Sequence, residues 1–254
     1  MAGILLSGCN GKMGKAVTLN AAATDGCKVV GGIDVFAQQL SDYPVFASPS
    51  LVSKDIIEKT DCIIDFSNPS ALAGLLEFAV ANSLPAVIAT TGLNDAQINM
   101  IKNAAERIPV FFSANMSLGV NLVCELAKKA ASVLGNSFDI EIVEMHHNQK
   151  LDAPSGTALM IADSVKEELE NDVKYEYDRH SKREKRSKNE IGIHSVRGGT
   201  ITGEHEIIFA GHDEIIKISH SARSKELFAT GAINAALFIS RKPAGLYNMS
   251  DMLR

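Results

Sequence analysis

The sequence predicts an α/β protein with two domains, in which a parallel-sheet domain is followed by a smaller α+β domain with a mixed or antiparallel sheet. Within residues 1–117, short apolar runs alternate with stretches of helical periodicity, which is the pattern of βαβ units. A glycine-rich turn joins the first apolar run to the first helical stretch. From residue 118 the pattern changes, and the length of 254 residues leaves room for a second domain beyond the roughly 150 typical of one.

The first domain is expected to contain five strands, each a short apolar run, and three helices with apolar residues at helical spacing. The strands are 4–7, 27–33, 62–66, 86–89 and 110–112. The helices are 13–23, a helix that starts at 68–70 and continues over 72–80, and 94–107. Pro69 favours a helix start, because proline fits the first helical turn. Strands that alternate with helices pair in parallel through right-handed crossovers.

The second domain is expected to start with a long helix and a half-exposed strand in which Phe138, Ile140 and Ile142 share one face. Short runs from residue 191 onward suit an antiparallel sheet. The expected elements are helix 118–134, strand 138–144, helix 158–169, a hairpin of 206–209 and 215–220 around a turn at 211–214, and a last apolar helix over 228–238. That last helix returns to the first domain, which therefore comprises 1–117 and 226–254, with 118–225 as the second domain.

Composition excludes several classes of protein. The 25 basic and 30 acidic residues give a formal net charge of −5, which argues against a nucleic-acid partner, because nucleic-acid binders carry an excess of Lys and Arg. No run approaches the roughly 20 consecutive apolar residues that span a membrane. The four cysteines, at 9, 27, 62 and 124, lack the short paired spacing of zinc or thioredoxin sites. They are expected to be free thiols in a cytoplasmic protein.

The glycine-rich turn is Gly8-Cys9-Asn10-Gly11-Lys12-Met13-Gly14, between the first strand and the first helix. Glycines there permit a sharp turn, a close approach of a pyrophosphate to the backbone, and tight packing of the helix on the strand. The helix N-terminus offers N–H donors to the phosphates. Asn10 stands where the usual pattern has its middle glycine, and Asp34 ends the second strand at the position of an acid that binds ribose hydroxyls. This context predicts a Rossmann-like dinucleotide-binding domain rather than a purely structural turn.

The residues at the end of the second strand mildly favour NADH over NADPH. The Asp34 carboxylate repels a ribose 2′-phosphate, and Val35 supplies no compensating cation. Lys12, inside the turn, is able to pair with a phosphate, so NADPH stays open as the alternative.

A second motif leaves a strand and enters a helix. It reads Glu144-Met145-His146-His147-Asn148-Gln149-Lys150-Leu151-Asp152-Ala153-Pro154-Ser155-Gly156-Thr157. The two histidines are poor zinc ligands, because neighbours in an extended chain point in opposite directions and no further His or Cys stands at ligand spacing. Lys150 and the amides of 155–157 suit an anionic substrate, with a carboxylate favoured. A nearby histidine can supply a proton near neutral pH, so the motif predicts an anion site with a proton donor and no metal.

The segment EMHHNQKLDAPSGTA closely resembles the signature of the 4-hydroxy-tetrahydrodipicolinate reductase (dihydrodipicolinate reductase) family. The resemblance covers nearly the whole chain, because further segments agree with the family in order and spacing. They are 8–14, Asp65-Phe66-Ser67, Ala89-Thr90-Thr91-Gly92, 113–117, 195–199, 203–205 and 228–232. Three positions depart from the family. Val35 stands where a basic residue is frequent, Asn68 where some members carry Arg, and Lys225 where an Arg is common.

The resemblance implies an enzyme that reduces 4-hydroxy-tetrahydrodipicolinate, a cyclic dicarboxylate, to tetrahydrodipicolinate with NADH or NADPH, in diaminopimelate and lysine biosynthesis. His146 would donate the proton and Lys150 would bind or polarise the substrate. The substrate carboxylates would be held by His147, Ser155, Gly156 and Thr157. The cofactor would be bound by Gly8, Asn10, Gly11, Lys12, Met13, Gly14, Asp34, Phe66, Ala89, Thr90, Thr91, Gly92, Ser113, Asn115 and Met116. The family further implies a homotetramer assembled through the sheets of the second domain.

Two other functions stay open: a dinucleotide-sensing regulator without catalysis, and a different NAD-dependent reductase of the same architecture. A sensor has no need of His146 and Lys150 beside a carboxylate-binding helix start, and no DNA-binding helix pair is recognisable. The segment 179–188 has six basic residues against Glu184 alone and is expected to be a solvated loop, the alternative being a guide for an anionic ligand. The remaining histidines, at 180, 194, 205, 212 and 220, are expected to be structural or exposed.

Overall fold

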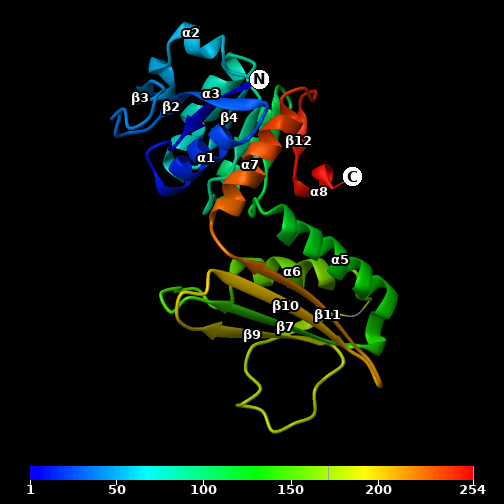
Figure 1. Ribbon diagram of the computed structural model, residues 1–254. Helices are drawn as coiled ribbons and strands as arrows, with labels where there is room; N and C mark the ends of the chain where they lie inside the picture. Colours follow the sequence, from blue (N-terminus) through cyan, green and yellow to red (C-terminus); the bar gives the residue numbers. More distant parts are fainter. Residues whose placement is uncertain (171, 254) are drawn as a thin grey trace. The chain divides into compact units, whose positions relative to one another are not determined.

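The computed structural model describes residues 1–170 and 172–253 (Figure 1). The chain divides into two compact units, one of Met1–Ser117 with Lys225–Arg254 and the other of Leu118–Ser224. Lys225, the last residue of the expected second domain, lies in the first unit. Among the described residues, no helix combines the length and apolar character needed to cross a membrane.

The first unit is built on a seven-stranded sheet in which every pairing is parallel, as the alternation of strands and helices predicts. The strands are β1 (Ala2–Ser7), β2 (Cys27–Ile33), β3 (Val45–Phe46), β4 (Cys62–Asp65), β5 (Ala86–Ile88), β6 (Pro109–Phe112) and β12 (Gly245–Tyr247). Their order in the sheet is β12-β6-β5-β4-β1-β2-β3. β2 and β3 lie on one side of β1, and β4, β5, β6 and β12 follow one another on its other side. Because the strand order reverses between β1 and β4, a crevice opens at the carboxyl ends of these two strands.

Helices cover both faces of this sheet. α1 (Lys12–Ala23) and α7 (Glu226–Ile239) share an apolar core with Ile4 and Leu6 of β1. α3 (Leu72–Ala81) and α4 (Asp95–Ala105) share a second core with Leu5, which points to the opposite face because side chains alternate along a strand. α2 (Lys54–Ile57) and α8 (Met249–Met252) are single turns. The predicted helix start at residue 68 is confirmed as a 3₁₀ turn, Pro69–Ala71, that leads into α3.

The second unit contains a five-stranded mixed sheet of order β11-β10-β7-β9-β8. Its strands are β7 (Asp139–His146), β8 (Lys174–Glu176), β9 (Glu190–Arg197), β10 (Gly203–Ala210) and β11 (Ile215–Ala222). The predicted hairpin is confirmed, since β10 and β11 pair antiparallel. The expectation of an antiparallel arrangement from residue 191 onward is wrong for β9, which pairs parallel with both β7 and β8. The long connection between β7 and β9 contains a helix, and such a crossover returns the chain in the same direction.

One face of the second sheet is covered by α5 (Leu118–Leu134) and α6 (Gly156–Lys166). Ile140 and Ile142 of β7 point into this core with Phe209 of β10. The burial of β7 alternates strictly, so Glu144 and His146 face the same side as Ile140 and Ile142. β7 therefore places two titratable side chains at the end of an apolar core.

Candidate active site

The glycine turn after β1 has the backbone geometry that its sequence predicts. Gly8 has a φ of +76°, which favours glycine, and a Cβ there would lie 2.6 Å from the carbonyl oxygen of Phe66. A Cβ on Gly14 would lie 2.3 Å from the carbonyl oxygen of Gly8, so a side chain would push α1 away from the turn. Gly11 is the N-cap of α1 and supplies no side-chain cap, which leaves first-turn amides directed at the turn. The arrangement suits a phosphate group.

Asn10 and Asp34 connect this turn to the segment that follows β2. The Asn10 amide donates to Asp34 Oδ2 at 3.0 Å, and the Phe36 amide donates to Asp34 Oδ1 at 3.0 Å. The Asn10 side chain donates to the carbonyl oxygens of Phe36 at 2.7 Å and of Gln38 at 3.0 Å. Through these hydrogen bonds, the Asn10 side chain holds residues 36–38 beside the turn, a contact that a glycine at this position could not make. Each Asp34 oxygen keeps a lone pair for a ribose hydroxyl.

A cavity of about 760 Å³ opens at this edge of the sheet. Its walls include Gly8, Asn10, Asp34, Phe36 and Phe66. The volume lies within the range of about 300–1,000 Å³ of small-molecule sites. Glycines that admit a phosphate, a carboxylate at the end of β2 and an apolar wall together fit the adenosine end of a dinucleotide.

The other cofactor candidates follow the carboxyl ends of the neighbouring strands. Thr90, buried after β5, donates its hydroxyl to Asp65 Oδ2 at 2.7 Å, which ties the ends of β4 and β5 together. Thr91 and Gly92 follow it and are exposed. Ala89 and Met116 are buried, as is Asn115, whose Oδ1 accepts from the Ser117 amide at 2.9 Å. Ser113 donates its hydroxyl to the carbonyl oxygen of Asn115 at 2.8 Å. Lys12 and Met13 begin α1.

In the second unit, the carboxylate of Glu144 is fully buried, and donors from several segments surround it. His146 Nδ1 lies 2.6 Å from Oε2, and the Ser155 amide donates to Oε1 at 3.1 Å. Arg197 of β9 binds both oxygens, at 2.8 Å to Oε2 and 2.7 Å to Oε1. Burial by itself raises the pKa of Glu144, but the hydrogen bonds from Arg197, His146, Ser195 and the Ser155 amide lower it to about 2. Glu144 is therefore ionised at neutral pH.

This ionised carboxylate determines which nitrogen of His146 carries a proton. A carboxylate only accepts hydrogen bonds, so Nδ1 of His146 must be its donor. Nε2 is left as the nitrogen that exchanges a proton with a ligand. A Cβ on Gly203 would lie 3.1 Å from Nε2, so the glycine there keeps space around that atom. The arrangement suits a proton donor.

Ser155, at the N-cap of α6, connects His146 to a second buried histidine. The Ser155 hydroxyl accepts from the Ala158 amide at 3.1 Å and lies 2.9 Å from Nε2 of His205. Its proton is therefore available to His205, whose ring lies edge-on to His146 with centroids 5.3 Å apart. Burial, together with the nearby His146, lowers the pKa of His205 to about 4. His205 is neutral at physiological pH, and its burial agrees with the structural role expected of it.

The loop between β7 and α6 carries the remaining substrate-site candidates. Lys150 lies 2.8 Å from Asp152 Oδ1, and this hydrogen bond lowers the pKa of Asp152. The Lys150 side chain is only 21% exposed, so it is held by the loop rather than free in solvent. His147 is half-buried, Gly156 is exposed at the first turn of α6, and Thr157 follows it. Within the second unit, the structure brings His146, Ser155 and α6 together on the end of β7.

Glu144 and Arg197 were not among the predicted site residues. The spacing of Glu144 and His146, two apart in an alternating strand, is a signal for a carboxylate and an imidazole on one face. Arg197 gives no such signal, because it reaches Glu144 only through the parallel register of β9, which places it opposite His146.

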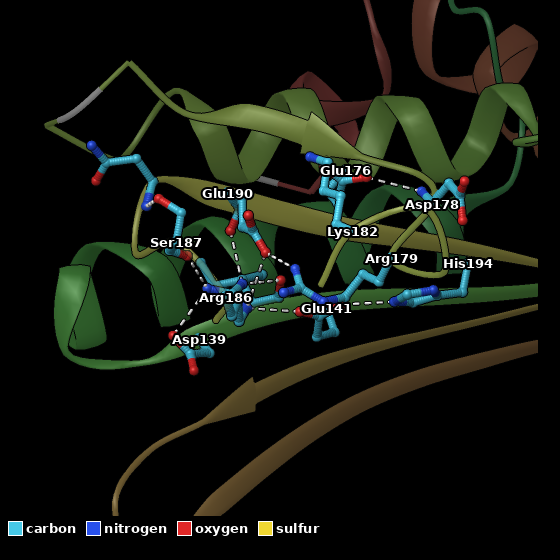
Figure 2. Close-up of polar contacts among 12 residues, drawn as sticks. Asp139, Glu141, Glu176, Asp178, Arg179, Lys182, Arg186, Ser187, Glu190 and His194 are labelled. Atoms are coloured by element: carbon cyan, nitrogen blue, oxygen red, sulfur yellow. Dashed lines mark hydrogen bonds and ion pairs between the residues drawn. The ribbon is translucent and has the colours of Figure 1, made fainter. Parts of the chain in front are cut away.

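Three basic residues of the segment 179–188 form ion pairs with acidic side chains of the second sheet (Figure 2). Arg186, with only 17% of its side chain exposed, donates to Glu141 Oε1 at 2.8 Å and to Asp139 Oδ1 at 3.0 Å. It also donates to the carbonyl oxygens of Ile140 and Glu190. Figure 2 shows the further pairs Arg179–Glu190 and Lys182–Glu176. The expectation of a solvated loop is wrong for Arg186, because its acidic partners and two of its carbonyl partners belong to β7 and β9. Arg179 is half-buried, and Lys182 remains exposed beside its acidic partner.

In the described part of the chain, no group of three or more His, Cys, Asp or Glu residues is arranged to hold a metal ion.

Comparisons with known proteins cover both units. A family model described as "Dihydrodipicolinate reductase, N-terminus" matches residues 2–116, and one described as "Dihydrodipicolinate reductase, C-terminus" matches residues 119–253. The chain is 49% identical over 251 residues to a protein of Caldanaerobacter subterraneus subsp. tengcongensis named 4-hydroxy-tetrahydrodipicolinate reductase, covering 99% of this chain and 98% of that protein. It is 45% identical over 253 residues to a protein of the same name from Clostridium tetani, covering 100% of this chain and 97% of the relative.

A solved structure supports the fold. It is described as a dipicolinate-bound dihydrodipicolinate reductase from Paenisporosarcina sp. TG-14. It matches 98% of this chain and 97% of its own, with a TM-score of 0.79 and 24% sequence identity.

Proposed function

The chain belongs to the dihydrodipicolinate reductase family, and we propose that it reduces 4-hydroxy-tetrahydrodipicolinate to tetrahydrodipicolinate with NADH or NADPH, in diaminopimelate and lysine biosynthesis. The main structural support for this proposal is the contact between His146 Nδ1 and the buried Glu144 carboxylate. It leaves Nε2 of His146 to give a proton beside the first turn of α6. A regulator that merely senses a dinucleotide has no use for this arrangement.

The proton and the ammonium act on charge that the reduction creates. A reduced nicotinamide cofactor held at the glycine turn and Asp34 would supply a hydride. Addition of that hydride to the conjugated imine of the substrate builds negative charge, which a nearby acid and cation relieve. We assign the acid to His146, which gives up its Nε2 proton and keeps Nδ1–H on Glu144, and the cation to Lys150. The water lost in the conversion takes the hydroxyl group from one ring carbon and a hydrogen from the neighbouring carbon. This loss forms the C=C bond conjugated with the imine, and the hydride and the proton from His146 then add across that bond.

We assign the substrate carboxylates to the start of α6 and the loop before it. Nothing lies within 4 Å of the position of a Cβ on Gly156, so the backbone at the first turn of α6 is open to a ligand. The helix N-terminus attracts an anion there, with Ser155 and Thr157 as its neighbours and His147 on the loop. Lys150 pairs with Asp152, and a substrate carboxylate would share its ammonium.

We propose NADH as the preferred cofactor, with NADPH as the alternative. Asp34 faces the cavity, Val35 adds no cation, and Lys12 is the basic residue of the turn. A titration of both cofactors, followed by their fluorescence, is expected to give the lower Kd for NADH. Equal affinity for the two would contradict the preference.

We also propose a cytoplasmic homotetramer assembled through the second sheet. The four cysteines are free and buried, which suits a reducing compartment. Val143 and Met145 of β7 and Ile208 of β10 are half-buried and point away from the core under α5 and α6. A sheet face with apolar side chains of this kind gains stability when another copy covers it.

The test of the reaction is a coupled assay that generates the substrate freshly and follows the absorbance of NADH. His146→Gln is expected to lower kcat by roughly 10²-fold or more, the usual scale of general acid catalysis. His212→Gln is the matched control, because His212 is a fully exposed histidine in the turn between β10 and β11. Near-normal turnover of His146→Gln would remove His146 from the mechanism, and an inactive wild-type protein that still binds NADH would favour the sensor.

A further inference from the structure

We propose that Glu144, neutralised by Arg197, is a positioning residue that holds both the proton donor His146 and the loop that carries Lys150. The inference rests on the proposed function, because it explains how that reaction's acid and cation are held in place. The two groups enter the network from different segments, His146 from the end of β7 and Lys150 from the loop that follows it.

The carboxylate of Glu144 is saturated with donors. Each of its two oxygens accepts at least two hydrogen bonds, and Ser195 is a further donor, so the acceptor positions of the carboxylate are filled from within the protein. A donor set of this kind fixes the plane of the carboxylate, and that plane in turn fixes the ring of His146. The Ser155 amide belongs to the N-cap of α6, so His146 is also held at a fixed place relative to the first turn of the helix.

Arg197 extends the network to the loop before α6. Besides its two bonds to Glu144, Arg197 donates from Nη2 to the carbonyl oxygen of Asp152 at 2.7 Å. The side chain of the same Asp152 holds the ammonium of Lys150 at 2.8 Å. A chain of hydrogen bonds therefore runs from His146 through Glu144 and Arg197 to the backbone of Asp152, whose side chain pairs with Lys150. Removal of the Glu144 charge would leave Arg197 without its counter-charge and loosen both ends of this chain.

The same strand carries a natural comparison on its other face. Glu141 contacts Nε2 of His194 at 2.7 Å and Nε of Arg186 at 2.8 Å, so it too joins a histidine to an arginine (Figure 2). His194 is 41% exposed in its side chain and has no part in the proposed reaction. Loss of either carboxylate should cost stability, but only loss of Glu144 should change the chemistry.

The experiment compares Glu144→Gln with Glu141→Gln in the full-length protein. Glutamine keeps the shape of the side chain but loses the charge, and it presents an N–H₂ group where the site needs an acceptor. We expect Glu144→Gln to lower kcat about 10- to 100-fold, because His146 is no longer held, and to raise KM for the substrate about 3- to 10-fold, because the Lys150 loop is loosened. We expect Glu141→Gln to leave both kcat and KM within about 3-fold of the wild type. Thermal unfolding of both variants shows how much stability each loses.

Glu144→Asp keeps the negative charge, but its side chain is one methylene shorter, so the carboxylate lies farther from His146 and Arg197. Its kcat is expected to lie between those of the wild type and Glu144→Gln. It also replaces Glu144→Gln if that variant does not fold. Wild-type kcat in any folded Glu144 variant, or an equal loss of kcat in Glu141→Gln, would overturn the inference. Failure of the proposed function is a separate outcome, because it would appear as a wild-type protein that does not reduce the substrate at all.

Discussion

At the scale of single residues, Asp34 and Glu144 are carboxylates with different surroundings. Asp34 accepts two backbone amides and borders a cavity, so its oxygens remain accessible to a ligand. Glu144 is fully buried and all of its acceptor positions are filled. The first is therefore suited to contact a ribose, and the second acts through His146 and Arg197 rather than on a ligand.

His205 makes the second unit sensitive to mild acid. Burial and the nearby charge of His146 lower its pKa to about 4, while Glu144 opposes this and His220 and Lys150 add to it. An unfolded chain protonates this histidine near pH 6.5. Between about pH 6.5 and 4, His205 is therefore protonated in the unfolded state but neutral in the folded state. The free energy of unfolding falls as the pH falls through this window.

We predict that His205→Gln flattens this part of the stability profile. Glutamine retains an oxygen that accepts from the Ser155 hydroxyl but does not titrate. The Tm, followed by circular dichroism from neutral pH to about pH 4, should fall less steeply for the variant than for the wild type. His212→Gln, at an exposed turn, should keep the wild-type slope. Parallel slopes for His205→Gln and the wild type would contradict the prediction.

At the scale of elements, the unit formed by β1, the glycine turn and α1 depends on a very close contact. A Cβ on Gly14 would lie 2.6 Å from the Cα of Cys9 as well as 2.3 Å from the carbonyl oxygen of Gly8. Both neighbours are backbone atoms and cannot move aside without moving the turn. The first turn of α1 therefore packs against the glycine turn in this position only with glycine at 14.

We predict that Gly14→Ala lowers the free energy of unfolding by about 1–3 kcal/mol, the range for overpacking, and weakens NADH binding at least 10-fold. Gly74→Ala is the matched control for stability, because it lies within α3 and a Cβ there would meet nothing within 4 Å. It should raise the free energy of unfolding by up to ~1 kcal/mol, since alanine is the better helix former. Urea unfolding and a fluorescence titration measure both effects, and unchanged NADH affinity in Gly14→Ala would refute the packing argument.

At the scale of the whole molecule, the proposed assembly through the second sheet has a direct consequence for mass. Four copies of the 27.2 kDa chain amount to about 109 kDa. Ile208→Glu places a charge among the half-buried apolar side chains of the sheet face and is expected to shift the sedimentation coefficient toward smaller species. Leu19→Glu, on an exposed position of α1, should leave the mass unchanged. A wild-type protein that sediments as an active monomer would rule out the tetramer.

Much of the first unit was predictable because its signals are local. The apolar runs of β1, β2, β4, β5 and β6 and the helices between them lie in continuous segments, and the glycine turn is complete within seven residues. β3 was missed because it has only two residues. β12 was missed because Gly245–Tyr247 contains a glycine and a tyrosine and so lacks the continuous aliphatic run by which the equally short β5 was predicted. In the second unit, the predicted antiparallel pairing of β9 was wrong, because the sequence of a strand does not specify which strand it pairs with or in which direction.

The sequence by itself determined the α/β class, the dinucleotide turn and the motif that contains His146 and Lys150, since each depends on residues close together in the chain. Only the tertiary structure decided what surrounds them. Arg197 lies 53 positions from Glu144, and His205 lies 50 from Ser155, yet each pair is joined by a hydrogen bond. Such contacts depend on strand register and on the return of the chain after α6, and both are set by the packing of the whole unit rather than by any one segment.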